Sequence, residues 1–407
     1  MPGPLSHIRV LDLSRVLAGP WAAQNLADLG AEVIKVERPG AGDDTRGWGP
    51  PWLKDADGKD TREPSYFLSV NRNKKSVTLD ISRPEGQAIV RELAAKCQVL
   101  VENYKVGTLQ KYGLGYDDLR KDNPGLIYCS VTGFGQDGPY APRPGYDFIF
   151  QGMGGLMSIT GERDGQPGAG PQKVGIAITD VLTGMYASLA ISAALVHRER
   201  TGKGQFIELA LLDTIVAFNA NQIVAYFCSG KIPARWGNAH GQVVPYEVFP
   251  TADGHIILAV GNDSQFASFC QTAGCPELAE EPRFKTMSQR IVHRGELIPL
   301  ITEIMRTRAK HEWIEALEAA NVPCGPINNM KEVFEDPQVR HRKLRVDMPH
   351  PTGGVAPVVA SPMRLAETPV EYRLAPPLLG QHNEEIYQGL LGKSAAEIER
   401  LKGAGIV

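Results

Sequence analysis

The chain has 407 residues, 43% of them hydrophobic and 22% charged, a composition typical of soluble globular proteins with two or three domains. Lys and Arg number 43 against 46 Asp and Glu, and the formal net charge of −3 excludes a general basic field for nucleic acid or an anionic membrane surface. A ligand that carries phosphates would therefore have to be bound by a local group of cations.

Cysteine and histidine spacing gives no sign of a metal centre. The six cysteines form no CxxC pair and the nine histidines no HExxH pattern, so we expect reduced thiols and no bound metal. The first ten residues lack a basic start followed by an apolar run, which predicts a cytoplasmic protein without an export signal. Residues 181–196 and 214–230, the longest uncharged stretches, fall short of a membrane span and predict buried core helices.

Residues 7–37 have the pattern of a βαβ unit. An apolar run at 7–13 is followed by a loop, by a helical pattern with Pro20 in its first turn, and, after Gly30, by a second apolar run at 32–36. A dinucleotide site of the GxGxxG type is not expected here, because Gly19 is the only glycine in the loop before the helix.

The same alternation continues along the chain. Strands are predicted at 76–80, 99–102 and 126–131, and a helix is predicted at 84–96. Strands that alternate with helices favour a doubly wound α/β layer with a parallel sheet.

Beyond residue 140 the composition and the predicted elements change several times. Residues 140–172 are rich in Gly and Pro and predict loops around one short helix, followed by a long helix at about 181–200. A strand at 205–209 and another apolar helix come next. Short strands at 244–249 and 255–260, with amphipathic helices up to residue 320, predict a smaller α+β domain, and the Pro-rich stretch 349–377 predicts an extended return arm.

Basic residues cluster near the predicted strand ends. Each one alone is typical of a solvated surface charge, but ligands of open α/β sheets bind outside the carboxyl ends of the strands, where several cations could converge on phosphates. The residues are Arg38, Arg46, Arg72, Lys74, Lys75, Lys105 and Lys111.

Two further segments each allow a structural and a functional interpretation. Asp180 follows the apolar run 174–179 and immediately precedes the predicted long helix, so it could be the N-cap of that helix or a carboxylate nucleophile. The segment 236–241, which contains His240, could be a turn or a mobile polar loop over a pocket. Spacing alone does not choose between these interpretations.

The motifs taken together resemble those of the class III CoA-transferases of the CaiB/BaiF type, over essentially the whole chain. They are VLDLSRVLAGP at 10–20, GAEVIKVER at 30–38, Gly42-Asp43, NRNK at 71–74, VENY at 101–104, Gly145-Tyr146-Asp147 and Thr179-Asp180. Segments 236–249, 325–330 and 376–382 are most similar to the branch of the family that moves CoA between succinyl-CoA and glutarate or hydroxymethylglutarate.

The resemblance implies a fold and an assembly. It implies a Rossmann-like, doubly wound α/β large domain that begins with residues 1–225 and is completed by a return arm at 326–407, with a small α+β domain at 226–325 between them. Two such chains are expected to interlock as a homodimer.

The resemblance also implies a reaction and a site. Asp180 would be the nucleophile that forms an aspartyl-CoA thioester, with acyl-CoA and a free dicarboxylate as substrates and no permanently bound cofactor. Arg15 and a substrate loop of Asn238, Ala239, His240 and Gly241 would bind the acceptor. The implied CoA contacts are Leu17, Ala18, Arg38, Leu79, Asp80, Ile81, Ser82, Asn103, Tyr104, Lys105, Lys111, Val131, Thr132, Gly133, Phe134 and Gly135.

Some residues depart from related activities. Formyl-CoA transferases carry Gln at the position of Leu17 and a glycine run at that of His240, which argues against oxalate or formate as substrate. An acyl-CoA racemase is an alternative, but its motif has His where Tyr146 precedes Asp147. A CoA-binding protein without catalytic activity is a second alternative.

Overall fold

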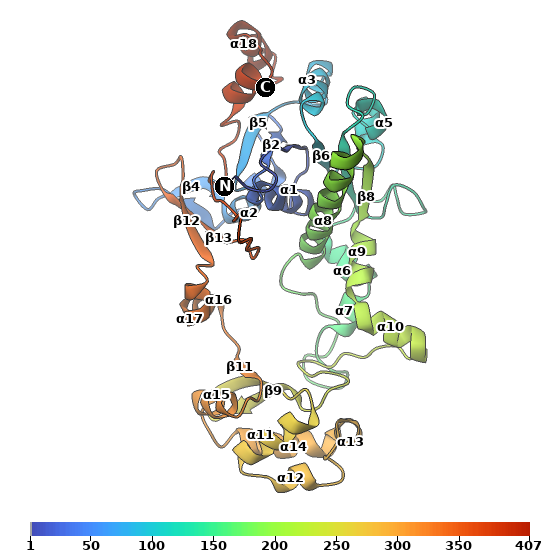
Figure 1. Cartoon of the computed structure of the whole chain (residues 1–407), viewed down its shortest axis with the longest axis vertical. Coiled ribbons are helices and arrows are strands. Elements are labelled where there is room, and N and C mark those ends of the chain that lie inside the picture. The colour runs from blue at the N-terminus through green and yellow to red at the C-terminus, as the bar shows by residue number, and fades with distance from the viewer. Residues whose placement is uncertain (1) are drawn as a thin grey trace. The chain divides into compact units, whose positions relative to one another are not determined.

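The computed structural model describes residues 2–407 (Figure 1). They form two compact units. The first contains the residues up to Leu156, Lys173–Ser229 and Arg340–Val407, and the second contains Met157–Gln172 and Gly230–Val339. The chain therefore leaves the first unit twice and returns to it at its carboxyl-terminal end.

The first unit is built on a six-stranded sheet in which all neighbouring strands are parallel, which confirms the predicted α/β layer (Figure 1). Because the chain adds strands on one side of β1 and then returns to add the rest on the other side, the loops after β1 and β6 diverge and leave a crevice at their carboxyl ends. In sheet order the strands are β5 (Lys74–Thr78), β2 (Glu32–Glu37), β1 (Arg9–Asp12), β6 (Val99–Glu102), β7 (Ile127–Thr132) and β8 (Phe206–Ala210).

Helices cover both faces of this sheet. On one face Leu11, Ile34 and Leu100 share an apolar core with α3 (Pro84–Ala95) and α18 (Ala395–Gly403). On the other face Val101 lies against α1 (Ala18–Asp28), and α1 packs along α8 (Ile178–Thr201). The first unit also contains η1 (Asp44–Gly47), β3 (Trp52–Lys54), β4 (Asp60–Pro64), α2 (Ser65–Val70), α4 (Thr108–Lys111), α5 (Tyr116–Leu119), α6 (Asp147–Met153), α9 (Leu211–Phe218) and α10 (Ala220–Ser229).

Three cations that the sequence predicted to be solvated are instead buried. A charge can be held in the interior only when it is paired and its remaining donors are satisfied, and each of the three meets a carboxylate from another segment. The pairs are Arg46 with Glu37 at 2.7 Å, Arg72 with Asp28 at 2.5 Å, and Lys74 with Asp12 at 3.0 Å. Arg38, Lys105 and Lys111 are exposed, as predicted.

The long helix α8 differs from its prediction in length and in burial. Its 24 residues are long and apolar enough to cross a membrane by length and composition alone, so the prediction that this stretch is too short is wrong. Within the first unit α8 packs against α1, α9 and β7. Only 39% of the apolar 18-residue stretch within α8 is buried, because Met185, Tyr186 and Leu189 are exposed.

The second apolar stretch is not one buried helix. It forms α9 and α10, which are bent by 71° relative to each other, and α10 buries none of its residues in this chain. The prediction of a core helix at 214–230 is therefore wrong for its second half, where Val224, Tyr226 and Phe227 are exposed.

The second unit has its own core around a three-stranded antiparallel sheet, β11 (Cys324–Pro326), β10 (Gly254–Ala259) and β9 (Tyr246–Thr251). Phe249, Ile256, Phe266 and Trp313 pack together there, as expected for an α+β layer. Its helices are α11 (Asp263–Ala273), α12 (Glu277–Glu280), α13 (Met287–Val292), α14 (Arg294–Met305), α15 (Lys310–Ala319), α16 (Met330–Glu335) and α17 (Pro337–His341), and α7 (Leu156–Ile159) leads into the unit.

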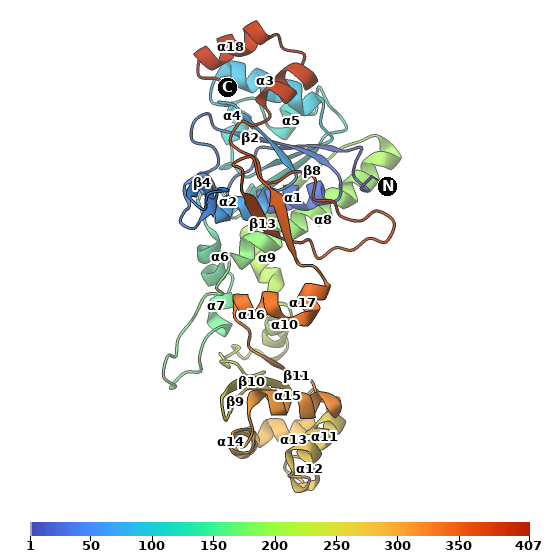
Figure 2. The same cartoon turned by 90° about the vertical axis from the view of Figure 1, so that its left-hand side faces the viewer.

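The return segment is only partly an extended arm. Strands β12 (Arg345–Pro349) and β13 (Val355–Val359) form a hairpin, and β13 contacts α2 (Figure 2). Farther along, the amide N–H of His382 donates to the carbonyl of Ser76 in β5, and a π-helix at Glu385–Leu390 precedes α18. The carboxyl-terminal segment therefore packs beside β5 and belongs to the first unit.

The close packing of α1 on α8 depends on Gly184. A Cβ at this position would lie 2.5 Å from the carbonyl oxygen of Ala18, so Gly184→Ala should force the helices apart. We expect the free energy of unfolding, measured by urea denaturation, to fall by about 1–3 kcal/mol. Gly403→Ala, at the open end of α18, is the control and should change it by less than about 1 kcal/mol. Equal effects of the two substitutions would contradict this packing.

Candidate active site

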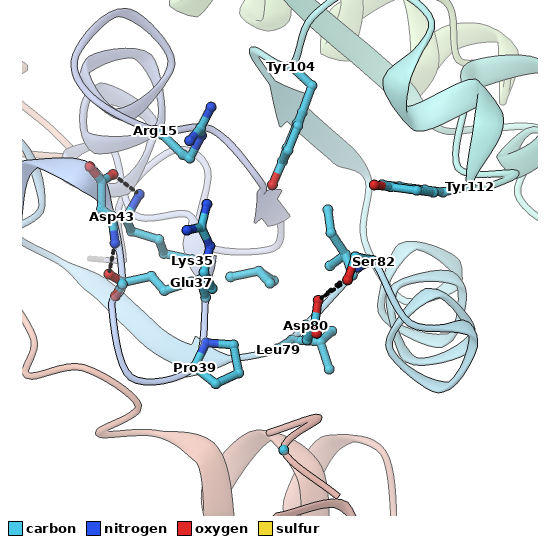
Figure 3. A pocket seen from close by; sticks show the side chains of 15 residues that line it. Arg15, Lys35, Glu37, Pro39, Asp43, Leu79, Asp80, Ser82, Tyr104 and Tyr112 are labelled. Carbon is cyan, nitrogen blue, oxygen red and sulfur yellow. Dashed lines mark hydrogen bonds and ion pairs between the residues drawn. The ribbon is translucent and has the colours of Figure 1, made fainter.

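Two adjoining pockets lie at the carboxyl ends of the central strands. We call them the Arg38 pocket, with a volume of about 550 Å³, and the Asp180 pocket, with a volume of about 360 Å³. Arg15 and Tyr104 line both, and the guanidinium carbon of Arg15 lies 5.5 Å from the centre of the Tyr104 ring. Figure 3 shows Arg15 and Tyr104 at one side of the Arg38 pocket. A single elongated ligand can therefore occupy both pockets.

The loop after β1 forms the wall between the pockets. Its conformation is fixed from β6, because the Asn103 side chain accepts from the Arg15 N–H at 2.9 Å and donates to the Arg15 carbonyl at 2.7 Å. The Arg15 guanidinium pairs with Asp44 at 2.8 Å, and its Nε is buried without a partner. Arg15 thus presents a guanidinium to the pockets with part of its donor capacity unused.

Asp180 is not the N-cap of α8, because the helix begins at Ile178 and Ala177 is the capping residue. The carboxylate lies in the first helical turn and lines the Asp180 pocket together with Leu17 and Ala18. No side chain or backbone group within residues 2–407 makes a hydrogen bond or ion pair with it. An unpaired carboxylate that faces a cavity is a candidate nucleophile.

The surroundings of Asp180 disfavour its charged form. Burial, together with the like charge of Asp147, raises the pKa of Asp180 to about 7. Near neutral pH the Asp180 carboxyl is therefore only partly ionised. A raised pKa also makes an oxygen nucleophile more basic and more reactive once it is ionised.

Asp147 is a residue whose role the sequence did not reveal, although it lies in one of the motifs. It is buried at the start of α6, and its carboxylate accepts from the Thr179 N–H and from the Gln151 side chain, each at 2.7 Å. Asp147 therefore satisfies a donor in the first turn of α8 from 32 residues upstream. No local pattern predicts such a long-range cap.

Two kinds of donor are available near Asp180. The first is the pair of backbone N–H groups of Leu17 and Ala18: both residues line the pocket at the amino-terminal end of α1, and their N–H groups meet no acceptor within residues 2–407. The second is the phenol of Tyr66, whose pKa is raised to about 12 by burial and by Asp180, Asp147 and Asp43. It therefore stays protonated and able to donate.

The structure brings most of the expected contact residues together. Those lining the Asp180 pocket are Arg15, Leu17, Ala18, Asn103, Tyr104, Lys105, Val131, Thr132, Gly133 and Asp180. Those lining the Arg38 pocket are Arg15, Arg38, Leu79, Asp80, Ile81, Ser82 and Tyr104. Lys111, Phe134 and Gly135 line neither one. Phe134 instead packs on Phe150 at a centroid distance of 5.0 Å, and the Gly135 N–H donates to Thr132.

The expected acceptor loop, Asn238–Gly241, belongs to the second unit. The ring of Trp236 lies near two guanidiniums, with Arg294 at 4.4 Å and Arg163 at 5.4 Å from its centre. Arg294 also donates to the His240 carbonyl at 2.5 Å. The loop is thus held by a cation–π stack and by hydrogen bonds of its own unit.

Comparison with known proteins places these residues in context. Residues 5–383 match the family model for CoA-transferase family III. The chain is 50% identical over 383 residues to the succinate–glutarate CoA-transferase of Agrobacterium fabrum, covering 94% of both proteins. It is 46% identical over 404 residues to the succinyl-CoA:glutarate CoA-transferase of Homo sapiens, covering 99% of this chain and 90% of that protein. A solved CAIB/BAIF family protein from Brucella suis has a TM-score of 0.84 and 44% identity, covering 96% of this chain and 100% of that one.

The raised pKa of Asp180 predicts a stability effect that grows with pH. Below the ordinary Asp pKa of 3.8 the carboxyl is neutral whether folded or unfolded, whereas above about 7 the folded protein carries a partly buried charge. Asp180→Asn should therefore raise the melting temperature little at pH 4 and most at pH 8. At pH 8 the expected gain in the free energy of unfolding is up to about 4 kcal/mol. Scanning calorimetry across this range measures the effect.

The control for this measurement is Asp137→Asn, because Asp137 is an exposed carboxylate of the same unit. It should show no comparable gain between pH 4 and pH 8. A loss of stability for Asp180→Asn at pH 8, or an equal change at both pH values, would contradict the assignment of a half-buried, unpaired carboxylate.

Proposed function

Because the chain belongs to CoA-transferase family III and is an enzyme of that class, we propose that it transfers CoA from succinyl-CoA to glutarate or a closely related dicarboxylate through a covalent intermediate on Asp180. The observation that carries this proposal is the Asp180 carboxylate itself, which is half-buried, unpaired and open to a pocket. The names of the relatives support the choice of substrates.

The two pockets suggest how CoA is bound. The Arg38 pocket offers the exposed Arg38 guanidinium, the Ser82 hydroxyl and the Tyr112 ring, a set suited to a nucleotide with phosphates. The pantetheine arm would pass Arg15 and Tyr104, which line both pockets, and its thioester would reach Asp180. CoA is an elongated molecule, so two adjoining pockets accommodate it better than either pocket would alone.

The reaction follows from the chemistry of two carboxylates. The ionised Asp180 attacks the thioester carbonyl of succinyl-CoA, so that a C–O bond forms, the C–S bond breaks and CoA leaves as a thiolate. The thiolate attacks the Asp180 carbonyl of the resulting anhydride, which releases succinate and leaves an aspartyl-CoA thioester. Glutarate attacks this thioester, and the same two steps in reverse produce glutaryl-CoA and regenerate the carboxylate.

Each addition step places negative charge on a carbonyl oxygen. The free N–H groups of Leu17 and Ala18 are suited to stabilise that oxygen, since they are fixed in place before the reaction. Water would hydrolyse the anhydride or the thioester without transferring CoA, so the site must also keep water from these intermediates.

The acceptor needs a partner for its second carboxylate. Arg15 is our candidate, because it lines both pockets and its planar guanidinium can bind a carboxylate through two donors. His240 is the second candidate, from the loop of the smaller unit. Neither residue is required for attack by Asp180, so they bear on the choice of acceptor rather than on the covalent chemistry.

The test combines product analysis with detection of the intermediate. Wild-type protein incubated with succinyl-CoA and free glutarate should give glutaryl-CoA by mass spectrometry, and Asp180→Asn should reduce its rate by at least about 10³-fold. Intact mass after rapid quenching, followed by hydroxylamine treatment, should show an adduct on the wild type alone. Full turnover by Asp180→Asn, or the absence of any adduct, would refute the intermediate, and failure with every diacid tried would refute the transfer.

We also propose that the chain acts as an interlocked homodimer. Apolar side chains on α8 and α10, such as Leu189 and Phe227, are 65% and 74% exposed, which is costly unless another surface covers them. A second copy is the partner that the family resemblance implies.

Light scattering coupled to gel filtration should therefore give twice the chain mass of 44.3 kDa. Leu189→Glu and Phe227→Glu should shift the population toward monomer, because each places a charge in the apolar contact. Val292→Glu, at an exposed apolar position of α13, is the control and should leave the dimer intact. A monomeric wild-type protein would overturn the proposal.

A further inference from the structure

The loop that forms the wall between the two pockets contains a strained residue. Val16 has a φ of 68°, in the left-handed region that β-branched residues rarely adopt. Such a conformation costs on the order of 1–3 kcal/mol and persists only where the surroundings impose it. Val16 directly precedes Leu17, the N-cap of α1, so its conformation sets the direction in which the helix begins.

Side chains from other segments hold three consecutive residues of this loop. Lys35 donates to the Ser14 carbonyl at 2.9 Å, and Asn103 holds both backbone groups of Arg15. The Val16 N–H donates to both carboxylate oxygens of Asp43, at 3.2 and 3.3 Å. The bond to Asp43 is the one made by the strained residue itself.

Asp43 is fixed more firmly than its place in a loop between β2 and η1 would suggest. It forms an ion pair with Lys35 at 2.8 Å in which both side chains are at most 1% exposed (Figure 3). It also accepts from the N–H and hydroxyl of Thr45. Its own N–H donates to Glu37 at 3.0 Å. The Asp43 oxygens are therefore held in place from several sides before they meet Val16.

The consequence lies one residue farther along the chain. With Val16 in the left-handed region, the loop turns into α1, and Leu17 and Ala18 line the same pocket as Asp180. The hydrogen bonds to Asn103 would still hold Arg15 if Val16 relaxed to a negative φ. The start of α1 would then have to turn away from the Asp180 pocket.

We propose that Asp43 is a positioning residue for catalysis: by holding Val16 in its left-handed conformation, it aims the Leu17 and Ala18 N–H groups at the oxygen that becomes negative when Asp180 attacks. This rests on the proposed function of Asp180. Asp43 also lines the Arg38 pocket, but it touches none of the reacting atoms in this scheme, and it acts through the loop backbone.

The test first removes the ion pair that holds Val16 and then removes the backbone strain at residue 16. Lys35→Met with Asp43→Leu replaces the ion pair by apolar side chains, a change that buried pairs often tolerate. We expect the kcat for CoA transfer from succinyl-CoA to glutarate to fall about 10²–10³-fold, the cost typical of a lost oxyanion donor, with KM changed less than about threefold.

Adding Val16→Gly to this double variant should restore kcat at least about tenfold, because glycine adopts the left-handed region without strain. Adding Val16→Ala is the matched control, since it also shortens the side chain but keeps the strain, and it should restore nothing. Unchanged kcat in a folded double variant, or equal rescue by Gly and Ala, would overturn the proposal.

A second pair of variants leaves the buried charges intact, in case the double variant does not fold. Val16→Pro, which fixes φ near −65°, should have a kcat at least about 10²-fold below that of Val16→Gly, while the melting curves show that both variants are folded. Full activity of Val16→Pro would overturn the proposal.

The proposed function and the positioning role can fail separately. A wild-type protein that forms no adduct on Asp180 refutes the proposed function. The positioning role is then decided by a crystal structure of the Lys35→Met, Asp43→Leu variant, in which residue 16 should have a negative φ. A φ that stays near 68° would overturn it whatever the activity.

Discussion

The buried ion pair between Lys35 and Asp43 is the interaction on which the active-site architecture depends. Removing two charges from water is expensive, and the cost is offset only when both ions keep good partners. Here those partners are backbone groups of the loop after β1 and of the segment after β2, so the two segments are held relative to each other by electrostatics. The neighbouring pair of Asp12 with Lys74 extends the network, because the Lys74 ammonium also donates to the Pro20 carbonyl of α1.

Asp180 is the opposite case, and the contrast indicates where the chemistry occurs. Lys35 and the Thr45 donors outweigh burial and lower the pKa of Asp43 to about 2, whereas burial and Asp147 raise that of Asp180 to about 7. Asp43 is buried and paired, whereas Asp180 is half-buried and lacks a partner. The cations of this region thus stabilise the loops and leave the charged form of Asp180 destabilised, as the proposed covalent role of Asp180 requires.

The sequence predicted the elements whose signals are local. The strand at 99–102 has the predicted bounds, and the parallel sheet follows from the alternation of strands and helices. It did not predict the buried cations, because the partner of Arg72 lies 44 residues away in α1. It placed the start of α8 three residues late, since the donor at Thr179 is satisfied by Asp147 in another helix. The exposed faces of α8 and α10 look like core in the sequence because apolar composition does not reveal which molecule covers a helix.

The pairing of Arg15 with Asp44 suggests how a dicarboxylate acceptor is distinguished from a monocarboxylate. In the proposed acceptor site, the second carboxylate of a diacid replaces Asp44 on the guanidinium, so that the cation keeps an anionic partner throughout. A monocarboxylate offers no group for this exchange and gains nothing from Arg15. Because Arg15 and Asp44 are 38% and 46% exposed, the exchange takes place where water screens both charges. Selectivity for diacids would then come from geometry, that is, from the distance between Arg15 and Asp180, rather than from the strength of one ion pair.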